Sequence, residues 1–326
     1  MKKFAGFIAL GIMLLILFFL SVNLGGLQVS PSELFRGIFI AYDKNVSIIW
    51  DLRFPRIIIA LLAGASMAVS GVLFQAVMKN PLADPGIIGV SSGAGFAAML
   101  VTLLFPSLYF ISPVFAFVGG IVAFMLIYGL SWSANLNPLR LILVGIAVNA
   151  VFTGLIQAIS YMTGGTQSGV ASIVNANITM KTWDDVQMLA VYAIVGLMAA
   201  CFVTAPCNML LLEDKTIWNL GVNVTRMRVF VSVIAVLLAS ITTAVAGVIG
   251  FVGLIGPHIG RLFVGSDHKA LIPFSLLLGS FIVLLADTVG RMLLYPLEIP
   301  ASIVMAVAGG PFFIFLLIRS GRHHGN

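Results

Sequence analysis

Long apolar runs separated by short polar segments follow one another along the whole chain. Ten runs are long enough to cross a membrane as helices, and they lie at 4–24, 57–78, 87–105, 113–133, 139–162, 186–206, 229–247, 248–264, 271–288 and 300–318. About 20 apolar residues in a helix span a hydrocarbon core roughly 30 Å thick. The runs do not alternate apolar with polar positions, which disfavours a β-barrel. The pattern predicts an all-α integral membrane protein, with one transmembrane domain over 1–326 and about ten helices.

The distribution of basic residues predicts the orientation of these helices. An even number of spans places both termini on the same side, and we expect that side to be the cytoplasm. The inner segments then carry eleven basic residues: Lys2, Lys3, Lys79, Arg140, Lys215, Arg226, Arg228, Arg261, Lys269, Arg319 and Arg322. The outer segments carry six: Arg36, Lys44, Arg53, Arg56, Lys181 and Arg291. This excess agrees with the positive-inside rule, although long loops contribute little to such a comparison.

Small residues and one proline interrupt the seventh and eighth runs. These are Gly247, Gly250, Gly253, Gly256 and Pro257. Broken helices at membrane depth need protein or water around their backbone groups. We therefore expect this region to face a cavity or a partner helix and not lipid.

Two outer segments, 25–56 and 163–185, are longer than simple turns, and we expect both to fold on the outer surface. In the first, Ser30 can cap a short helix that opens at Pro31, and Glu33 completes a capping box.

Composition supports a membrane location and adds little chemistry. Hydrophobic residues make up 60% of the 326 residues and charged residues 9%, against roughly a quarter charged in soluble domains. The net charge of +6 indicates cytoplasmic loops and not a nucleic-acid partner. The two cysteines, Cys201 and Cys207, predict neither a disulfide framework nor a metal site. The first run follows Lys2 and Lys3 and exceeds a signal-peptide core, so we expect it to remain as the first span.

The sequence offers no obvious source of energy for transport. It contains no Gly-Lys pair, so it lacks a phosphate-binding loop for ATP. All eleven acidic residues fall in loops or within about a turn of a predicted span's end, which disfavours an ion-coupled mechanism with a midplane carboxylate. Coordination of Na⁺ by backbone carbonyls stays open. No grouping of nucleophile, base and orienting residue indicates a membrane enzyme.

A mild polar stripe marks the fifth predicted span. Gly145, Asn149, Thr153 and Gln157 recur every four residues, which places them on one helical face. This face could line a water-accessible path for a solute. It could equally supply hydrogen bonds between membrane helices.

An amphipathic stretch, "LLEDKTIWNLGVNVTRMR", occupies 211–228 between the sixth and seventh spans. Gly221 can end one short helix and turn the chain into the next. The apolar face comprises Leu211, Leu212, Ile217, Leu220 and Val222, while the charged residues are Glu213, Asp214, Lys215, Arg226 and Arg228. Such a segment can lie on the lipid surface or fit a groove on a soluble partner. Its short length and mixed charge favour the partner.

Four stretches together resemble the binding-protein-dependent ABC import permeases for iron siderophores, haem and vitamin B12. They are the segment 211–228, "WDLRFPRIIIALLAGASMAVSGVLFQAVMKNPLADPGIIGVSSGAG" at 50–95, "GFVGLIGPHIGRLFVGSDHKALIP" at 250–273 and "ADTVGRMLLYPLEIPASIVMAVAGGPFFIFLL" at 286–317. The resemblance spans nearly the whole chain. One departure is Leu-Glu-Asp at 212–214, where the family usually has Leu-Gly followed by an acidic residue.

The resemblance implies a type II ABC importer-like permease in the bacterial plasma membrane. Its partners would be a second, identical permease subunit, two ATPase subunits that bind ATP and Mg²⁺, and an extracytoplasmic solute-binding protein. This chain would bind no cofactor or metal and would not itself be an enzyme.

The family's functional positions carry over residue by residue. Coupling to the ATPase, by a cytoplasmic segment at about 207–228, falls on Leu212, Glu213, Asp214, Ile217, Leu220, Gly221 and Val222. Docking of the binding protein falls on Arg53, Arg56 and Arg291, whose guanidinium groups suit carboxylates. The inner gate falls on Asn80, Pro81 and Leu82, and the translocation path on Gly145, Asn149, Thr153 and Gln157. Each arginine could instead be an interfacial anchor, and the gate a simple reverse turn.

Two points of the resemblance stay less specific. Pro257 and His258 match the family's Pro-His signature, but a histidine at a helix end more often serves packing than ligand binding. The loop "NANITMKTWDDVQMLAVY" at 175–192 is closer to haem-import permeases than to the vitamin B12 permease. We therefore expect an importer for haem or a ferric siderophore, with vitamin B12 import or an ion-coupled transporter or channel as alternatives.

Overall fold

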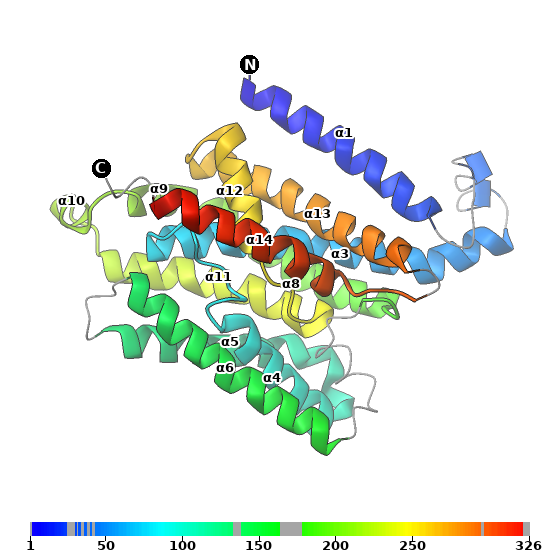
Figure 1. The fold of residues 1–326 in the computed structure, drawn as a ribbon, viewed down its shortest axis with the longest axis horizontal. Coiled ribbons are helices and arrows are strands. Elements are labelled where there is room, and N and C mark those ends of the chain that lie inside the picture. Colours follow the sequence, from blue (N-terminus) through cyan, green and yellow to red (C-terminus); the bar gives the residue numbers. More distant parts are fainter. Residues whose placement is uncertain are drawn as a thin grey trace.

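A computed structural model describes residues 2–24, 30, 32, 33, 36, 37, 40, 43–132, 138–163, 178–294 and 297–321 (Figure 1). The helices are α1 (Lys2–Asn23), α3 (Lys44–Met78), α4 (Val90–Leu104), η1 (Pro106–Ile111), α5 (Ser112–Trp132), α6 (Pro138–Met162), α8 (Trp183–Phe202), α9 (Thr204–Leu210), α10 (Asp214–Asn219), α11 (Val224–Ala246), α12 (Val252–Val264), α13 (His268–Leu293) and α14 (Ala301–Gly321). The predicted all-α architecture is confirmed.

Ten of these helices coincide with the ten apolar runs, in the predicted order. Within the described residues, seven helices are long and apolar enough to cross a membrane, and α4, α12 and α14 are shorter apolar helices. Figure 1 shows α9, α10 and the C-terminal end gathered at one end of the bundle, with the start of α3 at the other. We call the first the inner end and the second the outer end.

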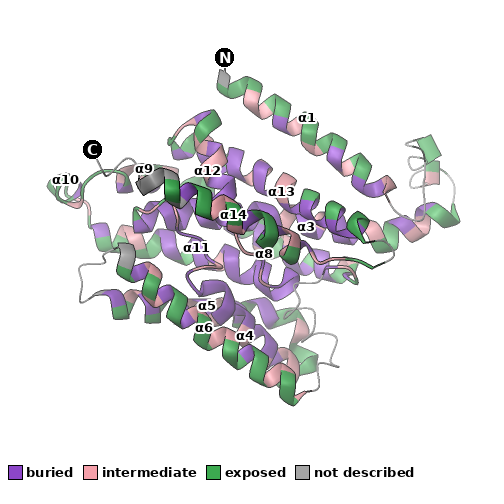
Figure 2. Cartoon of the chain, viewed as in Figure 1, coloured by how far each residue is buried: buried purple, intermediate pink, exposed green. Residues whose placement is uncertain are grey.

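Helix α3 lies at the centre of the protein. In the most apolar stretch of α3, 83% of the residues are buried, whereas the corresponding shares are 17% for α6 and 22% for α1. Figure 2 shows the same contrast between a buried centre and exposed outer helices. The helices around α3 approach closely at glycines: a Cβ on Gly64 would overlap the backbone of Gly279, and one on Gly71 that of Gly253. The missing side chains let the backbones touch.

Helix α3 begins 13 residues before the predicted span at 57–78, so the predicted start of this span was wrong. The Asp43 carboxylate accepts hydrogen bonds from the N–H groups of Asn45 (2.8 Å) and Val46 (3.1 Å), which caps the new start. Hydropathy missed this extension because it carries charged residues and extends the helix towards the outer end.

The predicted break between the seventh and eighth spans is confined to a short stretch between α11 and α12. Gly247 has φ +76° and Phe251 has φ +68°, and both lie in or beside this stretch. The prediction that Gly253, Gly256 and Pro257 also interrupt the helix was wrong, because all three lie inside α12. They are buried beside α3, so the shielding from lipid that we predicted comes from the chain itself.

The capping box in the first outer loop is confirmed. The Ser30 N–H donates to Glu33 Oε2 (2.7 Å), and the Glu33 N–H donates to Ser30 Oγ (3.2 Å). Pro31 and residues 164–177 of the second outer loop lie outside the described residues.

Candidate coupling, gate and docking sites

The predicted coupling segment forms a helix–turn–helix at the inner end. Helix α10 ends at Asn219, and Gly221 with φ +76° turns the chain towards α11, as the sequence predicted. Asn223 then caps α11 by accepting from the Arg226 N–H at 3.0 Å. A helix as short as α10 is not stable alone, so the turn at Gly221 and the cap at Asn223 help to define the shape of the segment.

Only one of the five predicted apolar-face residues is fully buried. Ile217 is buried and anchors α10, whereas Leu211, Leu212 and Leu220 are exposed. Trp218 was given no role from the sequence, and it is 68% exposed. A tryptophan within a charged segment could have indicated a surface that a partner covers. Exposed leucines and a tryptophan at one tip form an apolar surface of the kind that protein partners cover.

Asp214 connects this segment to two other helices. It forms ion pairs with Lys79 at the end of α3 (2.8 Å) and with Arg228 in α11 (3.0 Å). Partial burial opposes ionisation, but the hydrogen bonds and charges of Lys79 and Arg228 lower the pKa of Asp214 below its ordinary value. Lys79 also donates to the carbonyl oxygen of Leu212. From the sequence, Lys79 was counted only as one of the inner basic residues.

The predicted inner gate residues form a tight turn after α3. The Asn80 side chain accepts from the Leu82 N–H (2.9 Å), which is an Asx-turn. Pro81 is exposed and Leu82 half-buried. We call residues 79–89 the gate loop. Its Asp84 is fully buried and accepts from the N–H groups of residues 86 (2.8 Å) and 87 (3.1 Å).

The gate loop touches the predicted translocation path. A Cβ on Gly145 would lie 2.9 Å from the Cα of Ile88, and a Cβ on Gly89 would lie 2.9 Å from the backbone N of Asn149. From this contact the polar stripe runs along α6 through half-buried Thr153 to exposed Gln157. The contact with the predicted path is made by Ile88 and Gly89, at the end of the loop that begins with the predicted gate residues.

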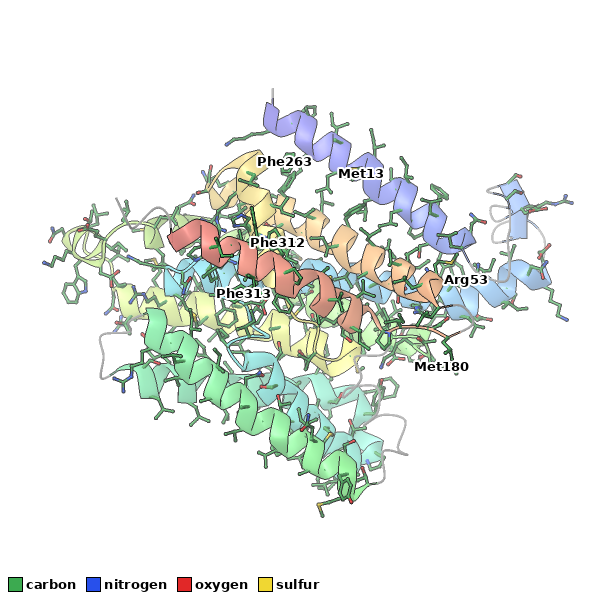
Figure 3. The ribbon with its side chains drawn as sticks, in the orientation of Figure 1. Met13, Arg53, Met180, Phe263, Phe312 and Phe313 are labelled. Carbon is green, nitrogen blue, oxygen red and sulfur yellow. The ribbon has the colours of Figure 1, made fainter. Side chains whose placement is uncertain are left out.

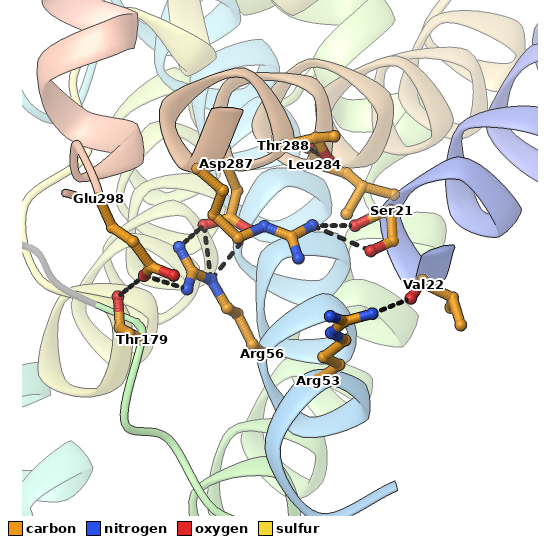
Figure 4. Close-up of polar contacts among 10 residues, drawn as sticks. Ser21, Val22, Arg53, Arg56, Thr179, Leu284, Asp287, Thr288 and Glu298 are labelled. Atoms are coloured by element: carbon orange, nitrogen blue, oxygen red, sulfur yellow. Dashed lines mark hydrogen bonds and ion pairs between the residues drawn. The ribbon is translucent and has the colours of Figure 1, made fainter. Parts of the chain in front are cut away.

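Figure 4 shows the predicted docking residues Arg53 and Arg56 close to each other on α3. The third, Arg291, lies 3.4 Å from Asp287, which also binds Arg56. Arg56 is buried and pairs with Asp287 (2.8 Å) and Glu298 (2.6 Å). Arg291 is also buried, and it donates to the carbonyl oxygen (3.1 Å) and hydroxyl (2.5 Å) of Ser21. Internal partners therefore occupy both guanidinium groups.

Arg53 is the most accessible of the three arginines. It is half-buried and donates to the carbonyl oxygen of Val22 at 2.6 Å. Figure 3 shows it at the outer end, towards the exposed Met180. Nearby, Thr179 donates to Glu298 at 3.0 Å. Burial alone would raise the pKa of Glu298, but the hydrogen bond and charge of Arg56 lower it.

Asp287 corrects the expectation that acidic residues lie at span ends. It is fully buried within α13, which continues to Leu293 and does not stop at 288 as predicted. The carboxylate is tolerated there because Arg56 neutralises it and Arg291 lies one turn away at 3.4 Å.

His258 has a packing environment. Its ring lies edge-on against Phe312 of α14, with centroids 5.7 Å apart. Pro257, the other residue of the Pro-His pair, is buried.

A bundle of about ten apolar helices with a short helix–turn–helix at its inner end is the architecture of a class of protein, the membrane-spanning permease of ABC importers. The FecCD transport family model matches residues 13–319, so the chain belongs to this family. It is a multi-pass membrane permease.

Individual relatives agree with this assignment. The "Probable heme-iron transport system permease protein IsdF" of Staphylococcus aureus strain bovine RF122 / ET3-1 is 39% identical over 99% of this chain and 98% of its own. The protein of the same name from strain MSSA476 is 38% identical over the same shares. A solved metal-chelate type ABC transporter in an inward-facing conformation has a TM-score of 0.80 at 29% identity, covering 97% of this chain and 99% of its own. PsaBC from Streptococcus pneumoniae, at TM-score 0.61 and 16% identity, covers 88% of this chain and 95% of its own and shares the fold.

Proposed function

We propose that this permease imports haem, driven by ATP hydrolysis in separate partner subunits. The observation that carries the cargo assignment is the 39% identity, over nearly the whole chain, to a permease named for haem-iron transport. A ferric siderophore is the second candidate, because a solved relative of 29% identity is described as a metal-chelate type transporter. Vitamin B12 has only the wider family resemblance in its favour.

The working transporter would contain two copies of this permease, and one ATPase subunit would bind the coupling segment of each copy at the inner end. The support is the apolar tip of Trp218 and Leu220, held in place by the buried Ile217 and by the ion pairs of Asp214. The chain itself would bind no nucleotide, metal or other cofactor. ATP and Mg²⁺ would belong to the ATPase.

A second copy of the permease would cover the exposed side of α6. In the most apolar stretch of α6 only 17% of the residues are buried, which is the lowest share among the candidate membrane spans. The stripe from Gly145 to Gln157 would then line a path between the two copies, closed at its inner end by the gate loop.

The binding protein would dock at the outer end. Because Arg56 and Arg291 have internal partners, we propose that they fix the ends of α1, α3 and α13 in the docking arrangement, while Arg53 makes the direct contact. An acidic residue of the binding protein could pair with Arg56 only by displacing Asp287 or Glu298.

The test is ATP-driven uptake in proteoliposomes that contain the permease, its ATPase and its binding protein. We expect haem to accumulate in preference to a ferric siderophore and vitamin B12, and uptake to require ATP. Accumulation by the permease alone from a sodium or pH gradient would refute the proposal. Siderophore uptake without haem uptake would retain the transport mechanism and change the cargo.

Gly221 provides a variant for the coupling role. A valine there is strained at φ +76°, although no atom lies within 4 Å of its Cβ position. We expect Gly221→Val to insert normally but to transport less cargo per ATP hydrolysed. Normal transport would contradict the assignment of this segment.

A further inference from the structure

The gate loop makes contacts with three separate parts of the protein. At its start it reaches the coupling segment, in its middle the beginning of α12, and at its end α6. We propose that Lys79 and Asp214 form a direct link through which movement of the coupling segment shifts the gate loop and, through it, the face of α6 at Gly145. This inference rests on the ATP-driven import proposed above.

The first contact is the ion pair at the end of α3. Lys79 closes this helix in the left-handed conformation, with φ 48°, and its Nζ lies 2.8 Å from Asp214 Oδ1. Asp214 is the first residue of α10 and also binds Arg228, four residues into α11. One carboxylate therefore connects the coupling helix both to the helix that follows it and to the end of α3, 135 residues earlier.

This ion pair contributes little to the stability of the fold. The side chains of Lys79 and Asp214 are 31% and 47% exposed, and solvent weakens ion pairs of that kind, so they add little stability. Breaking it should leave the bundle intact. A loss of transport in such a variant would therefore report on coupling and not on folding.

The middle of the gate loop is fixed to the core. Gln75, one turn before the loop, donates to the carbonyl oxygens of Ala83 (3.2 Å) and Gly253 (3.0 Å). Asp84 is buried and holds the turn at residues 86 and 87 through their N–H groups. A Cβ on Gly253 would lie 2.9 Å from Asp84 Oδ2, so the carboxylate sits directly against the start of α12. These contacts make the loop, the end of α3 and the start of α12 one rigid unit.

The end of the gate loop meets α6 backbone to backbone. Gly89 has φ +88° and faces the N of Asn149, and Gly145 faces Ile88. No flexible side chain lies between the two backbones at these points. Closely packed contacts of this kind transmit displacement with little compression. Movement of the loop must therefore move α6, or the two must separate.

The alternative is that the Lys79–Asp214 pair merely holds α10 against the bundle. In that case its loss would weaken assembly with the ATPase, and hydrolysis and transport would decline together. A coupling link predicts a different result, a fall in cargo transported per ATP hydrolysed.

The experiment measures this ratio in proteoliposomes with the complete transporter, using haem as cargo. The variants are Lys79→Met, Asp214→Asn and the double variant that combines them. We expect each single variant to lower the ratio by about fivefold or more, and the double variant to lower it no further than Asp214→Asn alone. Lys269→Met, which removes an exposed lysine at the start of α13, is the matched control and should keep the ratio. Thermal unfolding should be similar for all variants.

The outcomes separate this inference from the function on which it rests. If the unaltered transporter hydrolyses ATP without importing haem, the proposed function is wrong. If it imports haem and both single variants keep the ratio, only the link is wrong. A loss in the double variant that equals the two single losses combined would also overturn the link, because the two residues would then act separately.

Discussion

Replacing Arg56 with methionine tests the ionic network at the outer end. In the protein, three contacts of 2.8 to 3.0 Å join its guanidinium group to the fully buried carboxylate of Asp287, and a fourth of 2.6 Å reaches Glu298. Methionine fills much of the space but leaves Asp287 with Arg291 alone, at 3.4 Å.

The expected cost follows from the burial of Asp287, which is 0% exposed. Removing one partner of a buried pair costs about 3–5 kcal/mol, because the remaining charge is desolvated without compensation. For a protein somewhat larger than 250 residues we take about 2–3 °C per kcal/mol, so the melting temperature should fall by about 10 °C. Arg53→Met, which removes a half-buried arginine and its hydrogen bond to the Val22 carbonyl oxygen but leaves no buried carboxylate unpaired, should cost less than Arg56→Met.

The assay is thermal unfolding of the purified permease in detergent. Unfolding is measured as the loss of the monodisperse fraction after heating. The double variant Arg56→Met with Asp287→Leu removes the unpaired carboxylate and should recover part of the loss. The reasoning is refuted if Arg56→Met melts no lower than Arg53→Met. A variant that keeps full stability but no longer responds to the binding protein would instead show that Arg56 is a direct docking residue.

Three further predictions test the packing, the ATPase site and the ionisation of Asp214. Gly71→Ala should severely destabilise the protein, because its Cβ would overlap the backbone of Gly253; Gly129→Ala, with open space around it, should be neutral or stabilising by up to about 1 kcal/mol in the same unfolding assay. Trp218→Ala should weaken ATPase binding by more than about tenfold in a titration, while the similarly exposed Leu52→Ala at the outer end should not; equal affinities would remove Trp218 from the interface. The pKa of Asp214 is lowered in the folded protein, so its ion pairs persist above the ordinary pKa of about 3.9 and are lost only as pH falls through the lower folded value. Transport per ATP should therefore not change through this group between about pH 8 and pH 6. A decline in that range that Lys79→Met abolishes would contradict this reasoning.

The sequence was sufficient to predict the helices and their order because each apolar run carries its own signal. It also predicted local features, such as the positive φ of Gly221 and the capping box of Ser30 and Glu33, since these depend on neighbouring residues. It failed where partners are distant along the chain. Arg56 lies 231 residues before Asp287, and nothing in the local pattern of either residue indicates the other. The outer arginines were therefore assigned to docking or to interfacial anchoring, although Arg56 and Arg291 have internal partners.

The coupling segment shows the same limit in another form. Its apolar residues were predicted to form one face for a partner or for lipid, but Ile217 of that face is buried within the chain itself. Whether the remaining apolar residues are exposed depends on what α9, α11 and the gate loop cover. Lys79 was counted only as one inner basic residue, because its contact with Asp214 arises from the return of the chain to the inner end.

The two ionic networks differ in burial, and this difference indicates where the subunit can change shape. At the outer end Arg56, Asp287 and Arg291 are buried, and breaking their contacts costs several kcal/mol, about as much as a large part of a protein's net stability. At the inner end Lys79 and Asp214 are partly exposed, so their pair can break and reform at a cost of about 1 kcal/mol or less. A conformational cycle driven from the inner end would therefore move the coupling segment and the gate loop first. The outer ends of α1, α3 and α13 would move as one block, because separating them would expose an unpaired buried charge.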